Sequence, residues 1–144
     1  MKENVEYTYV MIKPDGVEQN ILDDVIKRFN NAGLEVSNIK EMTLTKEVLR
    51  EHYAHIVTRD FYPEVEEYML SGPVIAMIVK GENAVSKARE LMGPTRLAEP
   101  GTIRGDYRDK ELLHKNAIHG SDSKENAEIE IARFYDGLKV SELE

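Results

Sequence analysis

Cysteine is absent from the 144 residues of this chain, which excludes disulfide bonds, thiolate metal sites and a thiol nucleophile. No apolar run approaches the length that spans a membrane. The first residues, Met-Lys-Glu-Asn, lack the charged start and apolar middle of a signal peptide. We therefore expect a cytoplasmic protein that has no membrane partner.

Positive charge is also scarce, because 19 lysines and arginines stand against 27 aspartates and glutamates, for a formal net charge of −8. A broad basic face for nucleic acid is thereby excluded, since clustered cations hold the phosphate backbone. A small anionic ligand needs only a local group of lysines and arginines. With 41% hydrophobic residues the chain can enclose one core, so we expect a single domain over residues 1–144.

Hydrophobic patterning predicts four strands. Residues 5–13 and 34–44 are rich in β-branched or alternating apolar residues. The unbroken apolar run at 74–79 favours a central strand that is covered on both faces. Residues 116–118 form a short fourth strand. The segment 95–115 has turn residues but little periodicity, and so long a loop in a compact domain is usually functional.

Five helices are predicted between and after these strands, at residues 21–32, 45–56, 63–70, 83–92 and 124–134. Gly33 suits the residue just after a helix C-terminus, which often has a left-handed backbone. Thr45 and Asn83 suit N-caps, and Pro63 suits a first helical turn. The second and third helices would form a helical hairpin.

A histidine, His119, stands at the end of the fourth strand among small and polar residues. Its imidazole can be neutral, and therefore nucleophilic, near cellular pH. Gly120 lets the adjacent backbone approach a ligand closely or turn left-handed. Glu130 lies eleven residues further on, and if the chain turns back its carboxylate would hold one ring nitrogen and leave the other free to attack. The alternative is a helix-capping loop with an incidental histidine.

The residues after this histidine predict the start of the last helix. Ser121, Asp122 and Ser123 are all good N-caps. Asp122 and Glu125 also have the spacing of a capping box. A helix is therefore expected to begin directly beyond the histidine.

Other segments hold candidate binding residues. Lys13 lies at a strand end, where binding residues are common. The segment 101–105 offers backbone amides, a hydroxyl and the Arg104 guanidinium, which suit phosphate oxygens; the alternative is a surface turn with a salt-bridged arginine. Phe61 and Tyr62, at the tip of the hairpin, suit a clamp for a flat ring, or else anchor the hairpin in the core.

Four short segments, in order along nearly the whole chain, add a more specific signal. Residues 13–17 read Lys-Pro-Asp-Gly-Val, residues 71–74 Ser-Gly-Pro-Val, residues 100–106 Pro-Gly-Thr-Ile-Arg-Gly-Asp, and residues 116–123 Asn-Ala-Ile-His-Gly-Ser-Asp-Ser. Together they resemble the motifs of the nucleoside diphosphate kinase family.

The order of predicted elements suits a ferredoxin-like α+β sandwich, and the resemblance implies the same fold. It would be a four-stranded antiparallel sheet with helices on one face, plus an extra helical hairpin. The other face of the sheet would be available to a partner. The resemblance also implies a homo-oligomer, with a hexamer favoured and a tetramer or dimer as alternatives.

The resemblance further implies a ping-pong reaction between nucleoside triphosphates and diphosphates. His119 would accept the γ-phosphoryl group and pass it to a second diphosphate. Glu130 would hold the imidazole from its far nitrogen, and Ser121 would add a hydrogen bond nearby. Mg²⁺ would be carried by the nucleotide phosphates, with Asp122 reaching it at most through water.

Further site residues are implied by the same resemblance. Phosphate contacts would come from Arg89, Thr95 and Arg104. Ribose contacts would come from Lys13 and Asn116, with Lys13 also in the catalytic set because it would lie close to the transferred group. Phe61 would be the base platform, and Tyr53 would be a catalytic side chain beside the histidine. Stacking uses a face that every base possesses, so broad base tolerance is expected.

The chain departs from the family pattern in several places, one of which is the loop after Thr95, which is short and lacks the usual Asn-Pro. Residues 58–62 read Thr-Arg-Asp-Phe-Tyr rather than the usual Asp-Arg-Pro-Phe-Phe, and Ile56 stands where many members have a phosphate-contacting histidine, with His55 one place early. The segment 107–115 is also longer than usual, and Leu112 or Leu113 within it could oppose Phe61.

Two alternatives to a kinase fit the same residues less well. A nucleotide-binding relative that has lost transfer fits poorly with the retained His119 and Glu130. A hydrolase that uses His119, Ser121 and Asp122 would need three triad members within four residues, where relay geometry is hard to achieve.

Overall fold

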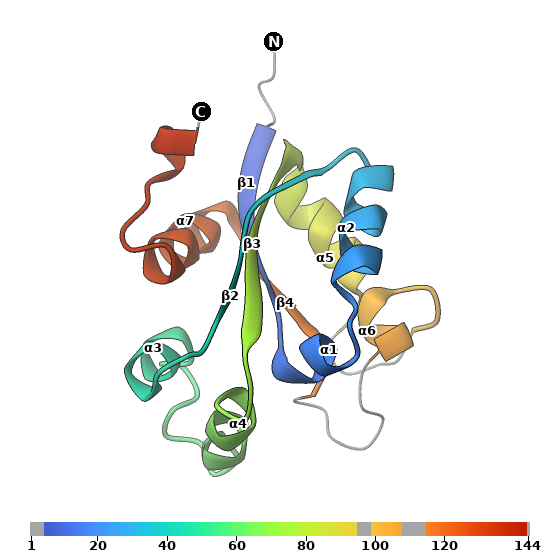
Figure 1. Cartoon of the computed structure of the whole chain (residues 1–144). Coiled ribbons are helices and arrows are strands. Elements are labelled where there is room, and N and C mark those ends of the chain that lie inside the picture. The colour runs from blue at the N-terminus through green and yellow to red at the C-terminus, as the bar shows by residue number, and fades with distance from the viewer. Residues whose placement is uncertain (1–4, 95–98, 108–114, 144) are drawn as a thin grey trace.

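The computed structural model describes residues 5–94, 99–107 and 115–143, and its centre is a four-stranded sheet (Figure 1). The strands are β1 (Val5–Ile12), β2 (Glu35–Met42), β3 (Val74–Glu82) and β4 (Ile118–Gly120). They are ordered β2-β3-β1-β4, and each neighbouring pair is antiparallel. The predicted ferredoxin-like α+β fold is thereby confirmed.

Helices connect and flank the strands. In chain order they are α1 (Pro14–Glu18), α2 (Leu22–Asn31), α3 (Lys46–His52), α4 (Tyr62–Met69), α5 (Ala84–Met92), α6 (Ile103–Tyr107), α7 (Lys124–Phe134) and a 3₁₀ turn at Val140–Leu143. Among the residues described, no helix combines the length and the hydropathy needed to cross a bilayer.

The two central strands, β1 and β3, pair along their whole lengths, from Val5 opposite Glu82 to Ile12 opposite Ile75. Most of their residues are buried regardless of which way the side chain points. This is the burial expected of a strand that is covered on both faces. The central position predicted for residues 74–79 is therefore confirmed.

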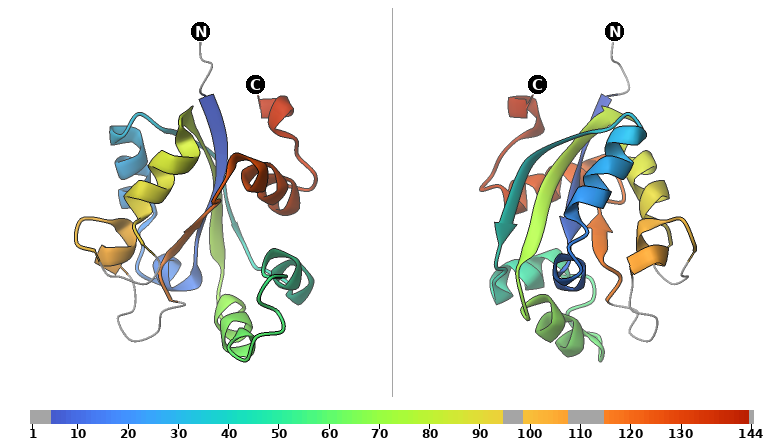
Figure 2. Two further views of the ribbon diagram at one scale, coloured as in Figure 1. Left: turned by 180° about the vertical axis from the view of Figure 1, so that it is seen from behind. Right: turned by 45° about the vertical axis from the view of Figure 1, so that its right-hand side comes forward.

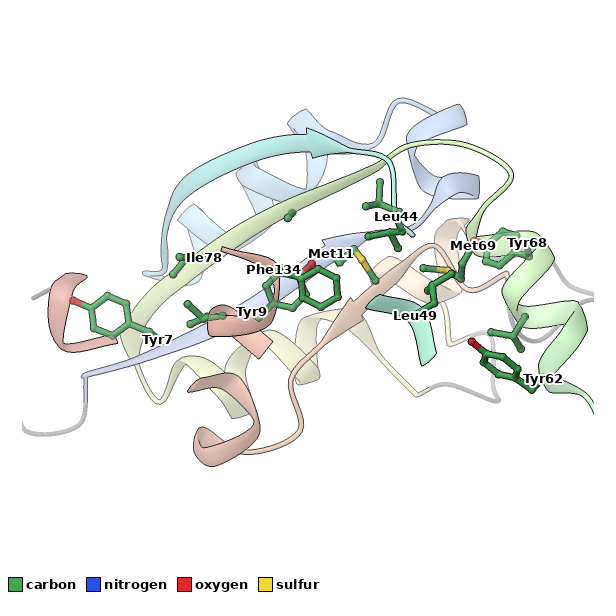
Figure 3. Packing of buried hydrophobic residues seen from close by; sticks show 14 residues of the cluster. Tyr7, Tyr9, Met11, Leu44, Leu49, Tyr62, Tyr68, Met69, Ile78 and Phe134 are labelled. Atoms are coloured by element: carbon green, nitrogen blue, oxygen red, sulfur yellow. The ribbon is translucent and has the colours of Figure 1, made fainter. Parts of the chain in front are cut away.

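Helices cover both faces of this sheet (Figure 2). Helices α2 and α5 pack with Val10, Ile12 and Val79 on one face. Helices α3, α4 and α7 pack on the opposite face, which the side chains in Figure 3 line. There Tyr9 of β1 stacks on Phe134 of α7 with ring centroids 4.6 Å apart. The prediction of helices on one face, with the other free for a partner, is wrong because α7 and the hairpin bury that second apolar face.

The helix ends follow the predicted signals in part. Thr45 caps α3, since its hydroxyl accepts a hydrogen bond from the Val48 amide at 3.2 Å, and Gly33 has a φ of +83° after α2. Asn83 occupies the N-cap of α5 but makes no side-chain cap bond. The carboxylate of Glu6, on β1, accepts from the Val85 amide instead, at 3.1 Å.

The structure differs from the predicted elements at four places. The fourth strand, predicted at residues 116–118, is β4 at Ile118–Gly120. Helix α3 ends at His52, although apolar spacing extended the prediction to residue 56. Residues 14–18, which are not among the five predicted helices, form α1. Helix α6 lies inside the segment that was predicted as a loop, where five residues are too few to show periodicity.

Candidate active site

His119 lies on β4, opposite Met11 of β1. Its ring is on the sheet face that α7 covers, with its centroid 6.1 Å from that of Tyr9. The imidazole borders a pocket of about 430 Å³ and is 20% exposed. The pocket is lined by Glu51, His52, Tyr53, Ala54, His55, Arg89, Arg104, His119, Gly120, Asp122, Asn126, Ile129, Glu130 and Arg133.

Gly120 lies directly against the core, where a larger residue would require the Met92 side chain to shift. A Cβ on this residue would lie 2.1 Å from the terminal methyl of Met92 in α5. Its φ is outside the left-handed region, which Ala117, at φ 72°, adopts instead. The close approach predicted from the sequence exists, but the described neighbour is a core methionine.

Helix α7 turns back after β4 and brings Glu130 to the histidine. Nε2 of His119 and Oε1 of Glu130 are 3.0 Å apart, and the Ser121 hydroxyl donates to the same carboxylate oxygen at 2.5 Å. Burial alone would raise the pKa of Glu130, but the hydrogen bond and charge of His119 and the bond from Ser121 lower it below its usual value. The structure thus brings these three residues together, as predicted, with an ionised carboxylate on Nε2.

The start of α7 uses a different cap from the predicted box. Ser123 is the N-cap, and its hydroxyl accepts a hydrogen bond from the Asn126 amide at 3.1 Å. Asp122 is exposed at the pocket and accepts a hydrogen bond from the side-chain amide of Asn126. The Asp122–Glu125 capping box is therefore not formed, and the Asp122 carboxylate faces the pocket.

Two arginines surround the backbone of His119. Arg89, on α5, donates to the carbonyl of Gly120 at 3.2 Å. Arg104, on α6, donates through Nε and Nη2 to the carbonyl of Ile118 at 3.2 and 3.0 Å, and through Nη1 to that of Gly93 at 2.9 Å. Both guanidinium groups therefore lie at the pocket, beside the residues that flank the histidine.

Lys13 and Asn116 form a second pair near β4. Lys13 Nζ donates to Asn116 Oδ1 at 2.9 Å, and both residues are buried. The Lys13 amide also donates to the carbonyl of Ala117 at 2.8 Å, which ties the end of β1 to the segment before His119. Neither side chain lines the pocket described above.

The remaining predicted residues lie at the hairpin or outside the described residues. Tyr53 lines the pocket, and burial raises the pKa of its phenol. Phe61, directly before α4, is 51% exposed and is not part of the pocket lining. Thr95, Leu112 and Leu113 lie outside the described residues.

His52 was not predicted as a site residue, although it contacts both members of the central pair. Its ring is almost perpendicular to that of His119, with centroids 4.7 Å apart, and its Nδ1 is 3.7 Å from Oε2 of Glu130. Arg133 donates to the same Nδ1 at 3.0 Å. Burial, with the nearby charge of His119, lowers the pKa of His52 to about 3, so this ring is neutral at physiological pH.

His55 and Ile56, where the hairpin departs from the family pattern, lie in different surroundings. Ile56 is partly buried against the core below the hairpin, whereas His55 is exposed and lines the pocket. The one-residue offset noted in the sequence thus leaves a histidine at the pocket wall. Only the tertiary structure reveals this, because the pocket lies between residues 51–55 and α7, which are far apart in the chain.

Two sets of potential metal ligands lie at the pocket, and they suit different ions. Among the described residues, ligand atoms of His52, His119 and Glu130 lie within 4.8 Å of one another. Mg²⁺ prefers oxygen ligands and retained waters, so this cluster does not suit it. The exposed carboxylate of Asp122 does.

Known proteins provide the decisive comparison. The family model for nucleoside diphosphate kinase matches residues 6–140. The chain belongs to the nucleoside diphosphate kinase family. It is 45% identical over 140 residues to the nucleoside diphosphate kinase of Halalkalibacterium halodurans, which covers 96% of this chain and 94% of that protein. The enzyme of Wolinella succinogenes is also 45% identical, over 95% of this chain and all of its own length.

Solved structures agree with this membership. The nucleoside diphosphate kinase of Aquifex aeolicus superposes with a TM-score of 0.83 at 38% identity, over 94% of this chain and 98% of that one. The enzyme of Encephalitozoon cuniculi gives 0.83 at 42% identity, over 90% and 88%. The predicted activity, nucleoside-diphosphate kinase, is thereby confirmed.

Proposed function

We propose that this kinase transfers the γ-phosphoryl group in two steps through a phosphohistidine on Nδ1 of His119. The observation that carries the proposal is the 3.0 Å contact between Nε2 and Glu130. With Nε2 held by a carboxylate, the Nδ1 lone pair is the one left for nucleophilic attack.

In the first step, Nδ1 bonds to the γ-phosphorus as the bond from that phosphorus to the bridging oxygen breaks, and the nucleoside diphosphate leaves with the electron pair. In the second step, a terminal oxygen of another diphosphate attacks the phosphohistidine and Nδ1 leaves. The ring gains positive character while it carries the phosphoryl group. The negative charge of Glu130 stabilises that state, and Ser121 fixes the carboxylate by donating to it.

The proposed role of the arginines follows from the charge of the transferred group. Phosphoryl transfer depends on positioning and charge neutralisation more than on covalent help. Arg89 and Arg104 lie on the two sides of His119 at the pocket, which supports their assignment to phosphate oxygens. Thr95 keeps the phosphate role that the resemblance implies.

The nucleoside would be bound by residues further from the histidine. The buried Lys13–Asn116 pair supports a role in holding ribose hydroxyls, since both side chains are fixed and polar. Phe61 is exposed enough to stack on a base. Tyr53, at the pocket beside His52, would complete the wall near the reacting phosphate.

Mg²⁺ is the proposed cofactor, and it would arrive on the nucleotide phosphates. When bound, it would neutralise part of the phosphate charge. Asp122 supplies an exposed carboxylate at the pocket, which supports a contact to the hydrated ion through water.

We also propose that residues 1–144 form one nucleoside diphosphate kinase domain that assembles into a homo-oligomer, with a hexamer favoured. Strand β2 lies at the edge of the sheet and exposes Ile39 by 45%, which supports association through this edge. A monomer by light scattering at micromolar concentration would contradict it. The cytoplasmic location stays a proposal, because one relative, from Pisum sativum, is named as chloroplastic.

The direct test of the mechanism is to incubate the protein with Mg²⁺ and γ-labelled nucleoside triphosphate. We expect an acid-labile, base-stable label on the chain, discharged by added diphosphate and absent from His119→Ala. Hydrolysis without a labelled chain would favour a hydrolase. Nucleotide binding without label or hydrolysis would favour a relative that has lost transfer.

Glu130→Gln tests the orienting role separately. This variant should form the phosphoenzyme at least roughly tenfold more slowly, as is typical when the partner that orients a reactive imidazole is lost. Glu128→Gln is the matched control, because Glu128 is an exposed residue on the same helix. Equal rates in the two variants would remove Glu130 from the mechanism.

A further inference from the structure

Arg104 depends on α6 for its position. This helix has only five residues, Ile103–Tyr107, so its own backbone hydrogen bonds hold it weakly. Ile103 anchors one side of it in the core and is fully buried. On its other side, Asp106 and Tyr107 extend toward α2, which lies on the same side of the sheet (Figure 1).

A closed network of four side chains joins the two helices there. Nη2 of Arg28, on α2, is 2.8 Å from Asp106 and 2.9 Å from Asp24. The Tyr107 hydroxyl donates to the same oxygen of Asp24 at 2.6 Å. The guanidinium carbon of Arg28 is 5.6 Å from the centre of the Tyr107 ring. Arg28 therefore bridges a carboxylate on each helix, and Tyr107 closes the loop.

Two further hydrogen bonds hold the backbone at the two ends of α6, one to Asp106 of this network and one from Gln19, outside it. The second oxygen of Asp106 accepts a hydrogen bond from the amide of Gly101, in the turn before the helix, at 3.2 Å. Gln19 donates to the carbonyl of Tyr107, at the end of the helix, at 2.8 Å. The position of α6 is thus fixed by contacts with α2 and with Gln19, which lies between α1 and α2.

This network is expected to add little to the stability of the fold. The side chains of Arg28, Asp24 and Asp106 are 23%, 35% and 35% exposed, and ion pairs in such surroundings contribute little to folding. The hydrogen bond from Tyr107 lowers the pKa of Asp24, and that from Arg28 lowers the pKa of Asp106. Both carboxylates are therefore charged at neutral pH. Their ion pairs with Arg28 connect α2 to α6, the helix that carries Arg104.

We propose that the network of Asp24, Arg28, Asp106 and Tyr107 is a positioning device for phosphoryl transfer, which holds α6 so that the Arg104 guanidinium stays beside His119. Its four members lie outside the pocket lining, so they act through Arg104 and not by contact with substrate. A displacement of about 1 Å in a charged group at a reacting centre can cost on the order of 100-fold in rate. The inference rests on the proposed role of Arg104.

The test is the single-turnover rate of phosphoenzyme formation in a double-mutant cycle. Arg28→Ala should slow this step by about tenfold while changing the KM for nucleotide by less than about twofold, because the transition state and not the bound nucleotide loses its partner. In an Arg104→Ala background the same substitution should cause no further loss, since the group that it positions is gone.

Matched variants separate positioning from folding. Lys27→Ala removes an equal charge from an exposed site on the same helix and should leave the rate unchanged. Asp106→Asn should reproduce the Arg28→Ala loss, and Arg28→Lys should restore part of it because the charge is kept. Thermal melting shows that each variant is folded at the assay temperature.

Three results would overturn the inference, and one of them would also overturn the proposed phosphate contact of Arg104. A normal rate in Arg28→Ala and Asp106→Asn, with a slow Arg104→Ala, overturns the positioning role alone. If Arg28→Ala slowed phosphoenzyme formation equally with and without Arg104, Arg28 would act independently of Arg104, and this result too would overturn the positioning role alone. A normal rate in Arg104→Ala overturns both the positioning role and the proposed phosphate contact.

Discussion

The two ends of the proposed nucleotide site are built differently. At the histidine end, His119, Glu130 and Ser121 form a mostly buried hydrogen-bonded group, with His52 packed against it. At the base end, Phe61 is half exposed and is outside the pocket lining. The contrast teaches where precision is needed. The reacting atoms must be aligned in advance, whereas a stacking platform that serves every base only needs to be available.

Arg104→Ala is the strongest way to break this comparison, because it removes a charge at the histidine end. Turnover should fall by roughly two orders of magnitude or more, as expected when a cation facing the transferred group is lost. Steady-state assays against Arg50→Ala, an exposed arginine of α3, provide the measurement and its control. Unchanged turnover would remove Arg104 from the site.

Phe61→Ala tests the base end. We expect nucleotide affinity to weaken by about 1–3 kcal/mol, with little change in the rate of phosphoenzyme formation, since stacking holds the base and not the reacting phosphate. Affinities for purine and pyrimidine nucleotides can be compared by titration calorimetry. Phe61→Tyr keeps the ring and should bind normally, and a base preference that sharpened in Phe61→Ala would contradict the tolerant platform.

At the histidine end, the buried imidazole of His52 should make the free energy of unfolding depend on pH, which no residue named at the base end is expected to do. Its folded pKa, about 3, is below the usual value, so between about pH 6.5 and pH 3 the unfolded chain binds the extra proton. Stability from the neutral ring is therefore complete above this window and falls as the pH drops through it, by about 1.4 kcal/mol per pH unit. Urea unfolding at pH 7, 6 and 5 measures the slope.

His52→Gln should flatten that slope, because the group that takes up the proton is removed. His55→Gln is the matched control: His55 is close in sequence but exposed, and the slope of the original protein should persist. If both variants had the same slope as the unchanged protein, His52 would not be the source of the acid sensitivity.

Thr45→Ala is expected to have the smallest effect and concerns neither end directly. Loss of the hydroxyl that caps α3 should lower the free energy of unfolding by about 1 kcal/mol. Turnover should be unchanged under conditions in which the protein stays folded. Denaturant titration beside an activity assay checks both statements, and a large loss of activity would show that the cap also orders the pocket wall.

Local signals in the sequence were reliable where one residue type satisfies a local need. The Thr45 cap, the left-handed Gly33 and the helix that follows His119 all formed as predicted. The choice among adjacent caps was not reliable. Ser123 and not Asp122 binds the helix amide, because three neighbouring residues have nearly equal propensity and the path of the chain selects among them.

The sequence by itself determined the family and the chain order of the four strands and five longer helices, and it indicated His119 as the candidate nucleophile, because motifs and periodicity are local properties of the chain. The tertiary structure alone decided that α7 and the hairpin cover the second sheet face, that His52 packs against His119, and that Arg28 reaches Asp106. Each of those contacts joins side chains far apart in sequence. The distance between such groups is set by how sheet and helices pack to exclude water, and no local pattern records it.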